Sequence, residues 1–180
     1  MFGGSRVAVR RASDAAPYTF AMRKDLSRLA ELRRLLILES APERAYDDIT
    51  RLLATSLDVP IALVNLLDDE RDWFKSCVGL PTRESPVETS FCESFFDTAE
   101  DVIVAEDTTT DPRFSAHPLV SGPPHIRFYA AARLVVNGQT VGTLCAYDVR
   151  PRNVSPEQLG HLQVLAAAVV ELLKQRPAAA

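Results

Sequence analysis

The feature that most constrains the fold is a predicted β-hairpin at residues 126–148, which read IRFYAAARLVVNGQTVGTLCAYD. Two apolar runs flank Asn137-Gly138, and an Asn-Gly pair supplies the positive φ angles of a tight type I′ turn. Each arm is about ten residues long, more than the usual ~5–6. Both arms are apolar on both faces, so the hairpin should lie in the middle of a sheet that is covered on both sides.

We expect the two faces of this hairpin to have different roles, because successive side chains of a strand point to opposite faces of a sheet. One face should pack on helices and include Leu134. The other should form the floor of a pocket and include Phe128. On this interpretation Phe128→Ala weakens ligand binding, whereas Leu134→Ala mainly lowers stability, by ~2–5 kcal/mol.

Three helices are expected around the hairpin. Apolar residues at helical spacing predict helices at residues 22–40 and 43–57, and Pro42 separates them. A closing helix to about residue 175 begins with residues 155–158, which read SPEQ. This string combines a capping serine with proline at the first helical position and glutamine at the third.

Shorter signals predict the remaining elements: strands at 61–67, 71–78 and 101–105, a loop at 79–89 and a short helix at 90–96. The short helix is inferred from the capping-box spacing of Ser90 and Glu93. Residues 106–125 form a long polar connection. A connection of this length inside a domain is usually functional or contains short helical turns.

This order predicts an α+β fold with a central antiparallel sheet of five or six strands. The N- and C-terminal helices should cover one face, and the short helices and loops of residues 90–125 the other. Residues 22–176 are expected to form one domain, between a poorly ordered basic tail at 1–21 and a frayed tail at 177–180. A loosely built cover over a sheet commonly encloses a ligand pocket.

Charge is distributed unevenly along the chain. Residues 1–34 carry a net charge of +5 and the remainder −9. A basic tail can bind nucleic acid or membranes but is more often solvated, and the acidic body argues against a nucleic-acid-binding face. No apolar run reaches the ~18 residues of a membrane span, and three scattered cysteines indicate reduced thiols. We therefore expect a cytoplasmic protein with no nucleic-acid or membrane partner.

Five short motifs in order resemble the GAF domain family. They are Trp73-Phe74-Lys75-Ser76, Ser90-Phe91-Cys92, Asp107 with Asp111-Pro112-Arg113-Phe114, Ile126-Arg127-Phe128-Tyr129, and Gly142-Thr143-Leu144-Cys145 with Asp148. The resemblance runs from about residue 25 to 175. It is strongest to the bacterial sensory GAF domains that precede histidine kinases, cyclic-di-nucleotide enzymes and transcription regulators. It implies a central antiparallel sheet between helical layers, and a domain that binds a small molecule or chromophore and signals through its terminal helices.

The resemblance also implies partners. GAF domains dimerise through terminal helices, and the apolar stripe of the first predicted helix is wider than a contact with the sheet requires, so we expect a homodimer. The 180 residues leave no room for an output domain. A separate kinase, cyclic-di-nucleotide enzyme or regulator is therefore the expected signalling partner. The alternative is a ligand-free GAF scaffold that only dimerises.

The predicted pocket lies between the hairpin and residues 90–125. Arginine side chains there would suit a carboxylate or phosphate ligand. Alternatively, the aromatic side chains form core and Asp111 pairs with Arg113 to fix the loop. The candidate ligand-binding residues are Phe91, Phe95, Asp107, Asp111, Arg113, Phe114, Arg127, Phe128 and Tyr147.

No cofactor, metal site or catalytic residue is predicted, and the ligand stays unknown. The Asn-Lys…Phe…Asp-Glu signature of cyclic-nucleotide GAF domains is absent. Bilin-binding relatives carry an attachment cysteine, in one group within Asp-x-Cys-Phe, but residues 111–114 read DPRF, with arginine in place of the thiol. This difference argues against a covalent bilin. No histidine is singled out as a haem ligand.

A small redox enzyme is the main alternative function. Free methionine sulfoxide reductases are also single GAF domains, and they use thiol chemistry. Cys92 is the redox candidate here because a helix N-terminus lowers a thiol pKa, although Glu93 opposes this effect. Cys77 and Cys145 lie in apolar strands. We favour a non-enzymatic sensory module in which all three cysteines are small buried side chains.

Overall fold

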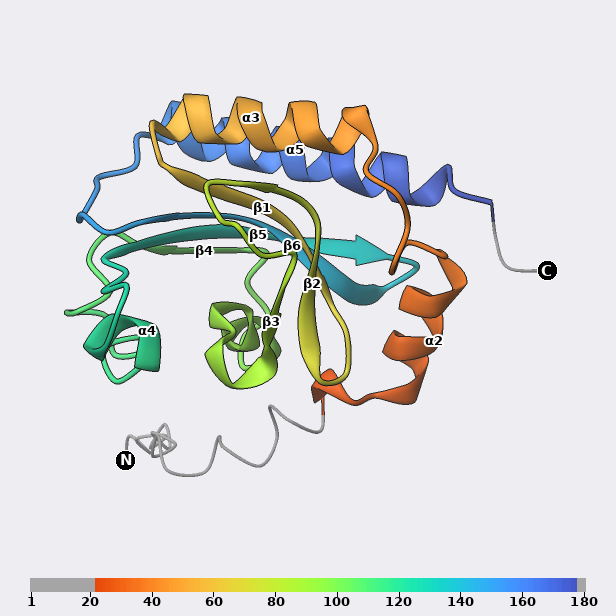
Figure 1. The fold of residues 1–180 in the computed structure, drawn as a ribbon, viewed down its shortest axis with the longest axis horizontal. Helices are drawn as coiled ribbons and strands as arrows, with labels where there is room; N and C mark the ends of the chain where they lie inside the picture. Colours follow the sequence, from red (N-terminus) through yellow and green to blue (C-terminus); the bar gives the residue numbers. More distant parts are fainter. Residues whose placement is uncertain (1–21, 178–180) are drawn as a thin grey trace, which may run out of the picture.

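The computed structural model describes residues 22–177, so the predicted tail at 1–21 lies outside it, as do residues 178–180 of the predicted tail at 177–180. Its centre is a six-stranded antiparallel sheet with strand order β3-β2-β1-β6-β5-β4 (Figure 1). The strands are β1 (Ile61–Leu67), β2 (Arg71–Val78), β3 (Glu84–Pro86), β4 (Val102–Ala105), β5 (Phe128–Val136) and β6 (Gln139–Asp148). The helices are α2 (Leu26–Arg34), α3 (Arg44–Leu57), α4 (Pro118–Ser121) and α5 (Pro156–Lys174), with 3₁₀ helices at Val87–Thr89 and Phe91–Phe96.

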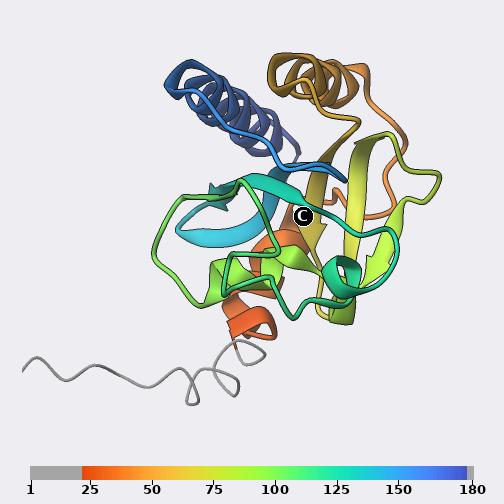
Figure 2. The ribbon, with the colours of Figure 1, turned by 90° about the vertical axis from the view of Figure 1, so that its left-hand side faces the viewer.

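The molecule has three layers. Helices α3 and α5 lie side by side on one face of the sheet, which we call the helix face (Figure 2). The 3₁₀ helices, α4 and the segments between them cover the opposite face. We call this cover, residues 87–100 and 106–127, the lid. The predicted α+β architecture is confirmed.

The predicted hairpin forms the centre of the sheet. Its strands β5 and β6 pair from Phe128 opposite Asp148 to Val136 opposite Gln139. Asn137 and Gly138 have φ angles of 49° and 77°, the left-handed pair that a type I′ turn needs. Strand β1 pairs with the free side of β6, and β4 with the free side of β5.

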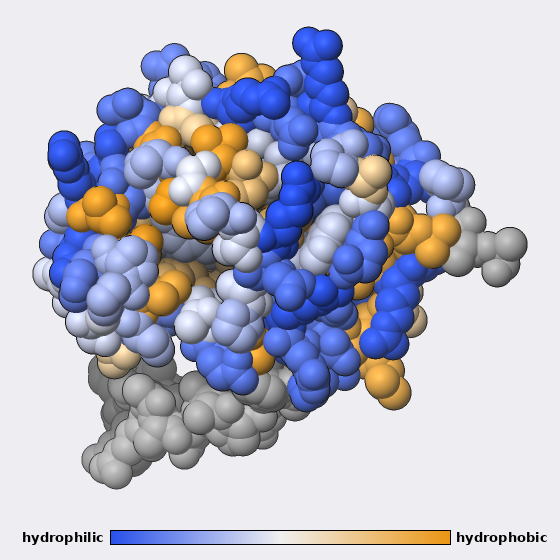
Figure 3. All heavy atoms as spheres, viewed as in Figure 1, coloured by the Kyte–Doolittle hydropathy of each residue, from blue (hydrophilic) through white to orange (hydrophobic). Residues whose placement is uncertain are grey.

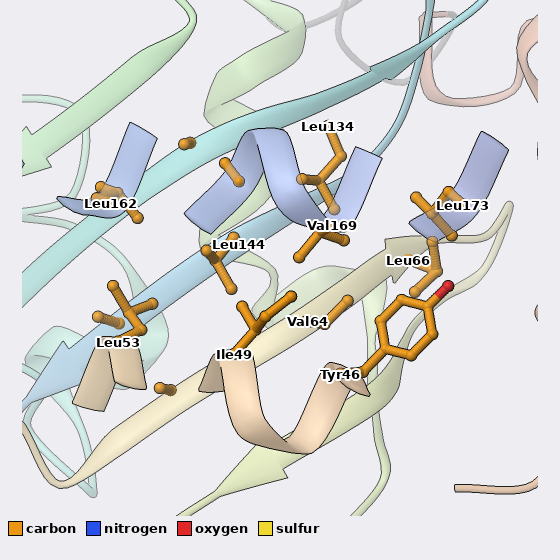
Figure 4. Close-up of a cluster of buried hydrophobic side chains, with 14 of the residues drawn as sticks. Tyr46, Ile49, Leu53, Val64, Leu66, Leu134, Leu144, Leu162, Val169 and Leu173 are labelled. Atoms are coloured by element: carbon orange, nitrogen blue, oxygen red, sulfur yellow. The ribbon is translucent and has the colours of Figure 1, made fainter. Parts of the chain in front are cut away.

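Apolar side chains fill the space between the sheet and the helix face (Figure 4). Tyr46, Ile49 and Leu53 of α3 point toward Val64 and Leu66 of β1, while α5 adds a second row over β5 and β6. The members of this row are Leu162, Val169 and Leu173, above Leu134 and Leu144. The apolar residues at helical spacing in α3 and α5 are therefore the ones that pack on the sheet, as the sequence predicted.

The predicted separation of Phe128 and Leu134 is wrong. Both are fully buried in the core of the helix face. They are six positions apart in β5, and an even separation keeps side chains on one face of a strand. Tyr129 and Ala131, which have the other parity, face the lid.

Helix α2 is shorter than the predicted helix 22–40. Asp25 caps its N-terminus by accepting a hydrogen bond from the Arg28 amide, and the helix ends at Arg34. Leu36 has a left-handed φ of 47° and is exposed, so the second half of the predicted apolar stripe is not helical. The predicted loop 79–89 differs too, since it contains β3 and a 3₁₀ helix.

Arg176 ties the end of α5 to the connector between α2 and α3. Its guanidinium group donates to the carbonyl oxygens of Leu35 (3.0 Å) and Leu36 (2.9 Å), and it pairs with Glu43 (2.5 Å). Lys75, buried in β2, pairs with the same carboxylate at 2.7 Å. The N-terminus of α5 carries the predicted capping box of Ser155 and Gln158.

On the face shown in Figure 3, apolar side chains reach the surface in small groups separated by hydrophilic ones. Isolated exposed apolar residues are common on protein surfaces. Those with the largest exposure are Met22, Leu26, Leu36, Leu52, Leu80, Val135, Val149 and Val164. Among the described helices, none combines the length and apolarity needed to cross a membrane.

Leu134→Ala and Phe128→Ala should destabilise the fold to a similar degree. Each leaves a cavity in the core of the helix face, so we expect losses of ~2–5 kcal/mol in the free energy of unfolding, measured by urea denaturation. Val135→Ala is the control, because Val135 is 36% exposed and should change stability by no more than about 0.5 kcal/mol. A Phe128→Ala variant as stable as this control would contradict the placement of Phe128.

Candidate functional site

The lid rests on a cluster of aromatic side chains centred on Phe91. The ring centre of Phe91 lies 4.1 Å from that of His117 and 5.2 Å from those of Phe114 and Tyr129. Tyr147 completes the group with an edge-on contact at 5.5 Å. These rings occupy the space between sheet and lid where the sequence predicted a pocket.

Two surface hollows are lined in part by residues of the lid. The first, which we call the lid groove, has a volume of about 510 Å³ and is lined by Ser90, Phe91, Glu93, Ser94, Asp97, Thr98, Glu100, Arg113, Phe114 and His117. The second, the β4-end hollow, has about 560 Å³ and is lined by Val104, Ala105, Glu106, Asp107, Thr110, Asp111, Pro112, Val154 and Leu159. Both volumes are in the range of small-molecule sites.

The structure brings only some of the predicted ligand-binding residues together. Phe91, Arg113 and Phe114 line the lid groove, and Asp107 and Asp111 line the β4-end hollow. Phe95 and Tyr147 pack in or against the lid-side core. Arg127 lies at the lid end of β5, and Phe128 faces away from the lid, in the core of the helix face.

Asp111 and Arg113 form an ion pair that fixes the lid loop. The shortest contact joins Arg113 Nη2 and Asp111 Oδ2 at 2.6 Å, and the same nitrogen donates to the Val104 carbonyl at 3.0 Å. The Arg113 hydrogen bond lowers the pKa of the Asp111 carboxyl group. This pairing is the structural role that the sequence left open as an alternative.

Asp107 and Arg127 also make local contacts in the lid. Asp107 accepts hydrogen bonds from the amide and the hydroxyl group of Thr109. Arg127 donates from Nη1 to the carbonyl oxygens of Val120 (3.0 Å) and Ile126 (3.1 Å). Both residues thus hold the irregular segment of the lid in place.

A buried polar network under the lid was not predicted from the sequence. Its centre is Asp72 of β2, which accepts hydrogen bonds from Arg23 (2.7 Å), Asn65 (2.9 Å) and Ser90 (2.6 Å). All four side chains are buried. These three donors come from the segment before α2, from β1 and from the lid, so one carboxylate joins three parts of the fold.

Arg23 extends this network to the rim of the lid groove. Its side chain is fully buried, pairs with Glu93 and Asp72, and donates to the Asp68 carbonyl at 2.7 Å. The predicted capping box of Ser90 and Glu93 is wrong, because the Ser90 hydroxyl group is used by Asp72 and makes no cap. Glu93 is instead the partner of Arg23. Burial raises the pKa of Glu93, and the positive charge of Arg23 opposes this effect.

The thiol of Cys92 lies next to the same network. Its Sγ atom is 3.1 Å from Thr143 Oγ1, 3.3 Å from the Tyr129 hydroxyl oxygen and 3.4 Å from Asn65 Nδ2. Asn65 Oδ1 is buried without a hydrogen-bond partner. One sequence signal was available, since Asn65 is a polar residue inside the apolar strand IALVNLL.

Histidine, cysteine and carboxylate groups do not assemble into a metal site within residues 22–177. His117 lies against Phe91, and its Nδ1 atom accepts a hydrogen bond from the Leu119 amide at 3.1 Å. Burial lowers the pKa of His117, so its ring is neutral at pH 7. The lining of the lid groove therefore combines aromatic rings with carboxylates, one arginine and a neutral imidazole.

A six-stranded antiparallel sheet with paired helices on one face and an irregular lid on the other defines an α+β domain of three layers. Residues 41–172 match the family model of the GAF domain. The chain therefore belongs to the GAF domain family, as its motifs predicted. A GAF domain is a sensory or regulatory module.

Known proteins similar to this chain include a cyclic di-GMP phosphodiesterase of Pseudomonas aeruginosa, 35% identical over 153 residues, which are 82% of this chain. The matched part spans 26% of that relative, about a quarter of its length. The GAF domain of an Acinetobacter phosphoenolpyruvate-protein phosphotransferase has the same fold, with a TM-score of 0.61, 18% identity, and coverage of 83% of this chain and 94% of that one. A type II free methionine-R-sulfoxide reductase from Thermoplasma acidophilum has a TM-score of 0.57 and 14% identity, with coverage of 74% and 94%.

Arg23→Met should destabilise the protein strongly. The substitution leaves the buried Asp72 carboxylate without its cation, and breaking a buried pair in this way costs about 3–5 kcal/mol. Urea denaturation followed by circular dichroism measures the effect. Arg44→Met is the control, because the Arg44 side chain is 91% exposed and its loss should cost no more than about 0.5 kcal/mol.

Adding Asp72→Asn to Arg23→Met should recover part of the lost stability, since it removes the uncompensated charge. Equal stability of Arg23→Met and the Arg44→Met control would show that the buried pair does not hold the lid.

Proposed function

We propose that this chain is a non-enzymatic sensory module that binds a small molecule in the lid groove and relays its occupancy to a signalling enzyme. One observation carries the proposal: Glu93 lines the groove and also pairs with the fully buried Arg23. A ligand that contacts Glu93 competes with Arg23 for the carboxylate. Because Arg23 precedes α2 and also holds Asp72, binding is coupled to the position of the N-terminal helix.

The lining of the groove favours a ligand with a cationic group and an apolar or aromatic part. Glu93, Asp97 and Glu100 contribute three carboxylates, against one arginine, Arg113. The guanidinium group of Arg113 is already paired with Asp111, which lies outside the groove lining. Phe91 and Phe114 line the groove as buried aromatic rings, and they form its apolar wall. This reading replaces the carboxylate or phosphate ligand that the arginines alone suggested.

We infer a cyclic-di-nucleotide enzyme as the signalling enzyme, attached or separate. The support is the 35% identity to a relative named as a cyclic di-GMP phosphodiesterase. A kinase or a transcription regulator is the alternative output. The three free thiols fit the reducing conditions of the cytoplasm, where we place the protein.

The groove can be tested by native mass spectrometry of protein purified from its own host under mild conditions. We expect an added mass that is lost on denaturation. Thr98→Trp should abolish it, because the indole fills the lid groove. Thr110→Trp is the control, since it places the same ring in the β4-end hollow from an exposed threonine, whereas Thr98 is half-buried.

Retention of the ligand by Thr98→Trp, with loss in Thr110→Trp, would move the site to the β4-end hollow and contradict the proposal. An apo mass in all three proteins, together with a dimer, would favour the scaffold function. Turnover of free methionine sulfoxide with a thioredoxin system would favour the redox enzyme.

We also propose that the protein dimerises through its long helices. Val164 of α5 and Leu52 of α3 are 69% and 57% exposed on the outer side of this layer. Paired helices in two copies would bury these side chains together with the exposed small residues of α5. The contact is isologous, so one apolar position counts twice in a symmetric dimer.

Val164→Glu should shift the mass measured by light scattering from dimer to monomer at tens of micromolar protein, because it places two like charges in the symmetric contact. Val149→Glu, at a residue that is 48% exposed but lies outside the helices, should leave the dimer intact. A monomer mass for the unmodified protein under these conditions would rule out the dimer.

A further inference from the structure

Two cysteines meet beneath the lid. Cys92 belongs to the 3₁₀ helix Phe91–Phe96, and Cys145 lies in the middle of β6, opposite Ala131 of β5. Both side chains are fully buried in the lid-side core. Cys92 Sγ lies 3.1 Å from Thr143 Oγ1, and Cys145 is two residues further along β6, on the same face of the strand. The pair therefore joins a lid residue to a central strand.

The surroundings of the two sulfur atoms are unequal. The Cys92 sulfur is the focus of polar groups from three strands: the Asn65 amide, the Thr143 hydroxyl and the Tyr129 hydroxyl, at 3.4, 3.1 and 3.3 Å. A sulfur approached by several donors is stabilised as a thiolate. For Cys145 the geometry shows only a distant contact of its sulfur with the Leu63 carbonyl, at 3.9 Å.

The acidities of the two thiols follow from these contacts. Burial raises the pKa of Cys92, but the neighbouring Cys145 thiol and the hydroxyl groups of Thr143 and Tyr129 outweigh burial and the nearby Asp72, and the pKa lies below its ordinary value. Burial raises the pKa of Cys145, and the neighbouring Cys92 raises it further. Cys92 is thus suited to attack an oxidant, and Cys145 to resolve the product.

We propose that Cys92 and Cys145 form a peroxide-sensitive dithiol, in which oxidation of Cys92 leads to a disulfide that locks the lid onto the sheet. The proposal is independent of the ligand in the lid groove. It adds a second input to the domain, a hydroperoxide. Disulfides in the cytoplasm are usually transient and redox-sensing, in keeping with such a role.

The reaction balances with hydrogen peroxide as the oxidant. The Cys92 thiolate attacks one peroxide oxygen, the O–O bond breaks, and hydroxide leaves and is protonated to water, giving Cys92 sulfenic acid. The Cys145 thiol then loses its proton and attacks the Cys92 sulfur. The S–O bond breaks and the second hydroxide leaves as water. In total, two thiols and one peroxide give one disulfide and two waters.

Access to Cys92 runs through the lid. Its chain neighbours Phe91 and Glu93 line the lid groove, and all three residues belong to the 3₁₀ helix Phe91–Phe96. Hydrogen bonds of 3₁₀ helices have poorer geometry than those of α-helices, and local opening of such segments exposes buried groups. Hydrogen peroxide is small enough to enter through an opening of this kind.

Cys77 provides an internal control. It is the most exposed of the three thiols, being half-buried at the end of β2. Burial nevertheless raises its pKa, and its thiol makes one long contact, with the Leu80 carbonyl at 3.7 Å. Exposure alone predicts that Cys77 reacts first. The surroundings of the sulfur atoms predict Cys92 instead.

The test is a titration of the reduced full-length protein with hydrogen peroxide, followed by alkylation in denaturant and peptide mass mapping. We expect a loss of two hydrogen atoms from the intact monomer, a cross-linked peptide containing Cys92 and Cys145, and a Cys77 that is still alkylated. Reduction with dithiothreitol should reverse the change. First oxidation at Cys77, or a disulfide between two chains, would overturn the proposal.

Three variants separate the steps. Cys145→Ser should stop the reaction at Cys92 sulfenic acid, which dimedone traps, while Cys77→Ser should form the disulfide as the unmodified protein does. Tyr129→Phe removes one donor from the Cys92 sulfur and should slow oxidation several-fold. An unchanged oxidation rate in Tyr129→Phe, with no dimedone adduct in Cys145→Ser, would also overturn the proposal. The mapping of the unmodified protein decides the matter even if a variant fails to fold.

Discussion

The arrangement of this domain depends on one buried carboxylate. Asp72 has lost its hydration, and such a group is tolerated only when cations and donors surround it. Arg23, Asn65 and Ser90 meet this requirement at 2.6–2.9 Å. Because the three belong to different layers, satisfying Asp72 also sets the positions of the N-terminal segment and the lid. Apolar packing alone would leave the irregular lid free to settle in several ways.

Elements with strong local signals were predicted well from the sequence. Asn137-Gly138 fixes the hairpin turn, Ser155 with Gln158 caps α5, and the apolar spacing of α3 identifies its buried face. In each case neighbouring residues decide the conformation, and the tertiary structure agrees with them. The α+β architecture follows, since a central two-sided hairpin requires a cover on each side.

The site could be predicted only in part, because its contacts join distant parts of the chain. Arg23 and Asp72 are 49 positions apart, and no local pattern pairs them. Ser90 and Glu93 have the spacing of a capping box, yet they make no cap. Ser90 instead donates to Asp72, and Glu93 pairs with Arg23. Of the predicted aromatic pocket residues, Phe91, Phe114 and Tyr147 lie together under the lid and Phe128 does not, and the clustered rings fill the space that was expected to hold a ligand.

Arg176 at the end of α5 has a mechanical consequence. Its guanidinium group fastens that helix to the connector on which α2 also depends, through two carbonyl oxygens and Glu43. Arg23 lies just before α2, and Arg176 holds the connector just after it. The two arginines therefore anchor α2 at both of its ends. The contacts of Arg176 therefore connect α5 with the chain that follows α2 by a route that does not run through the sheet.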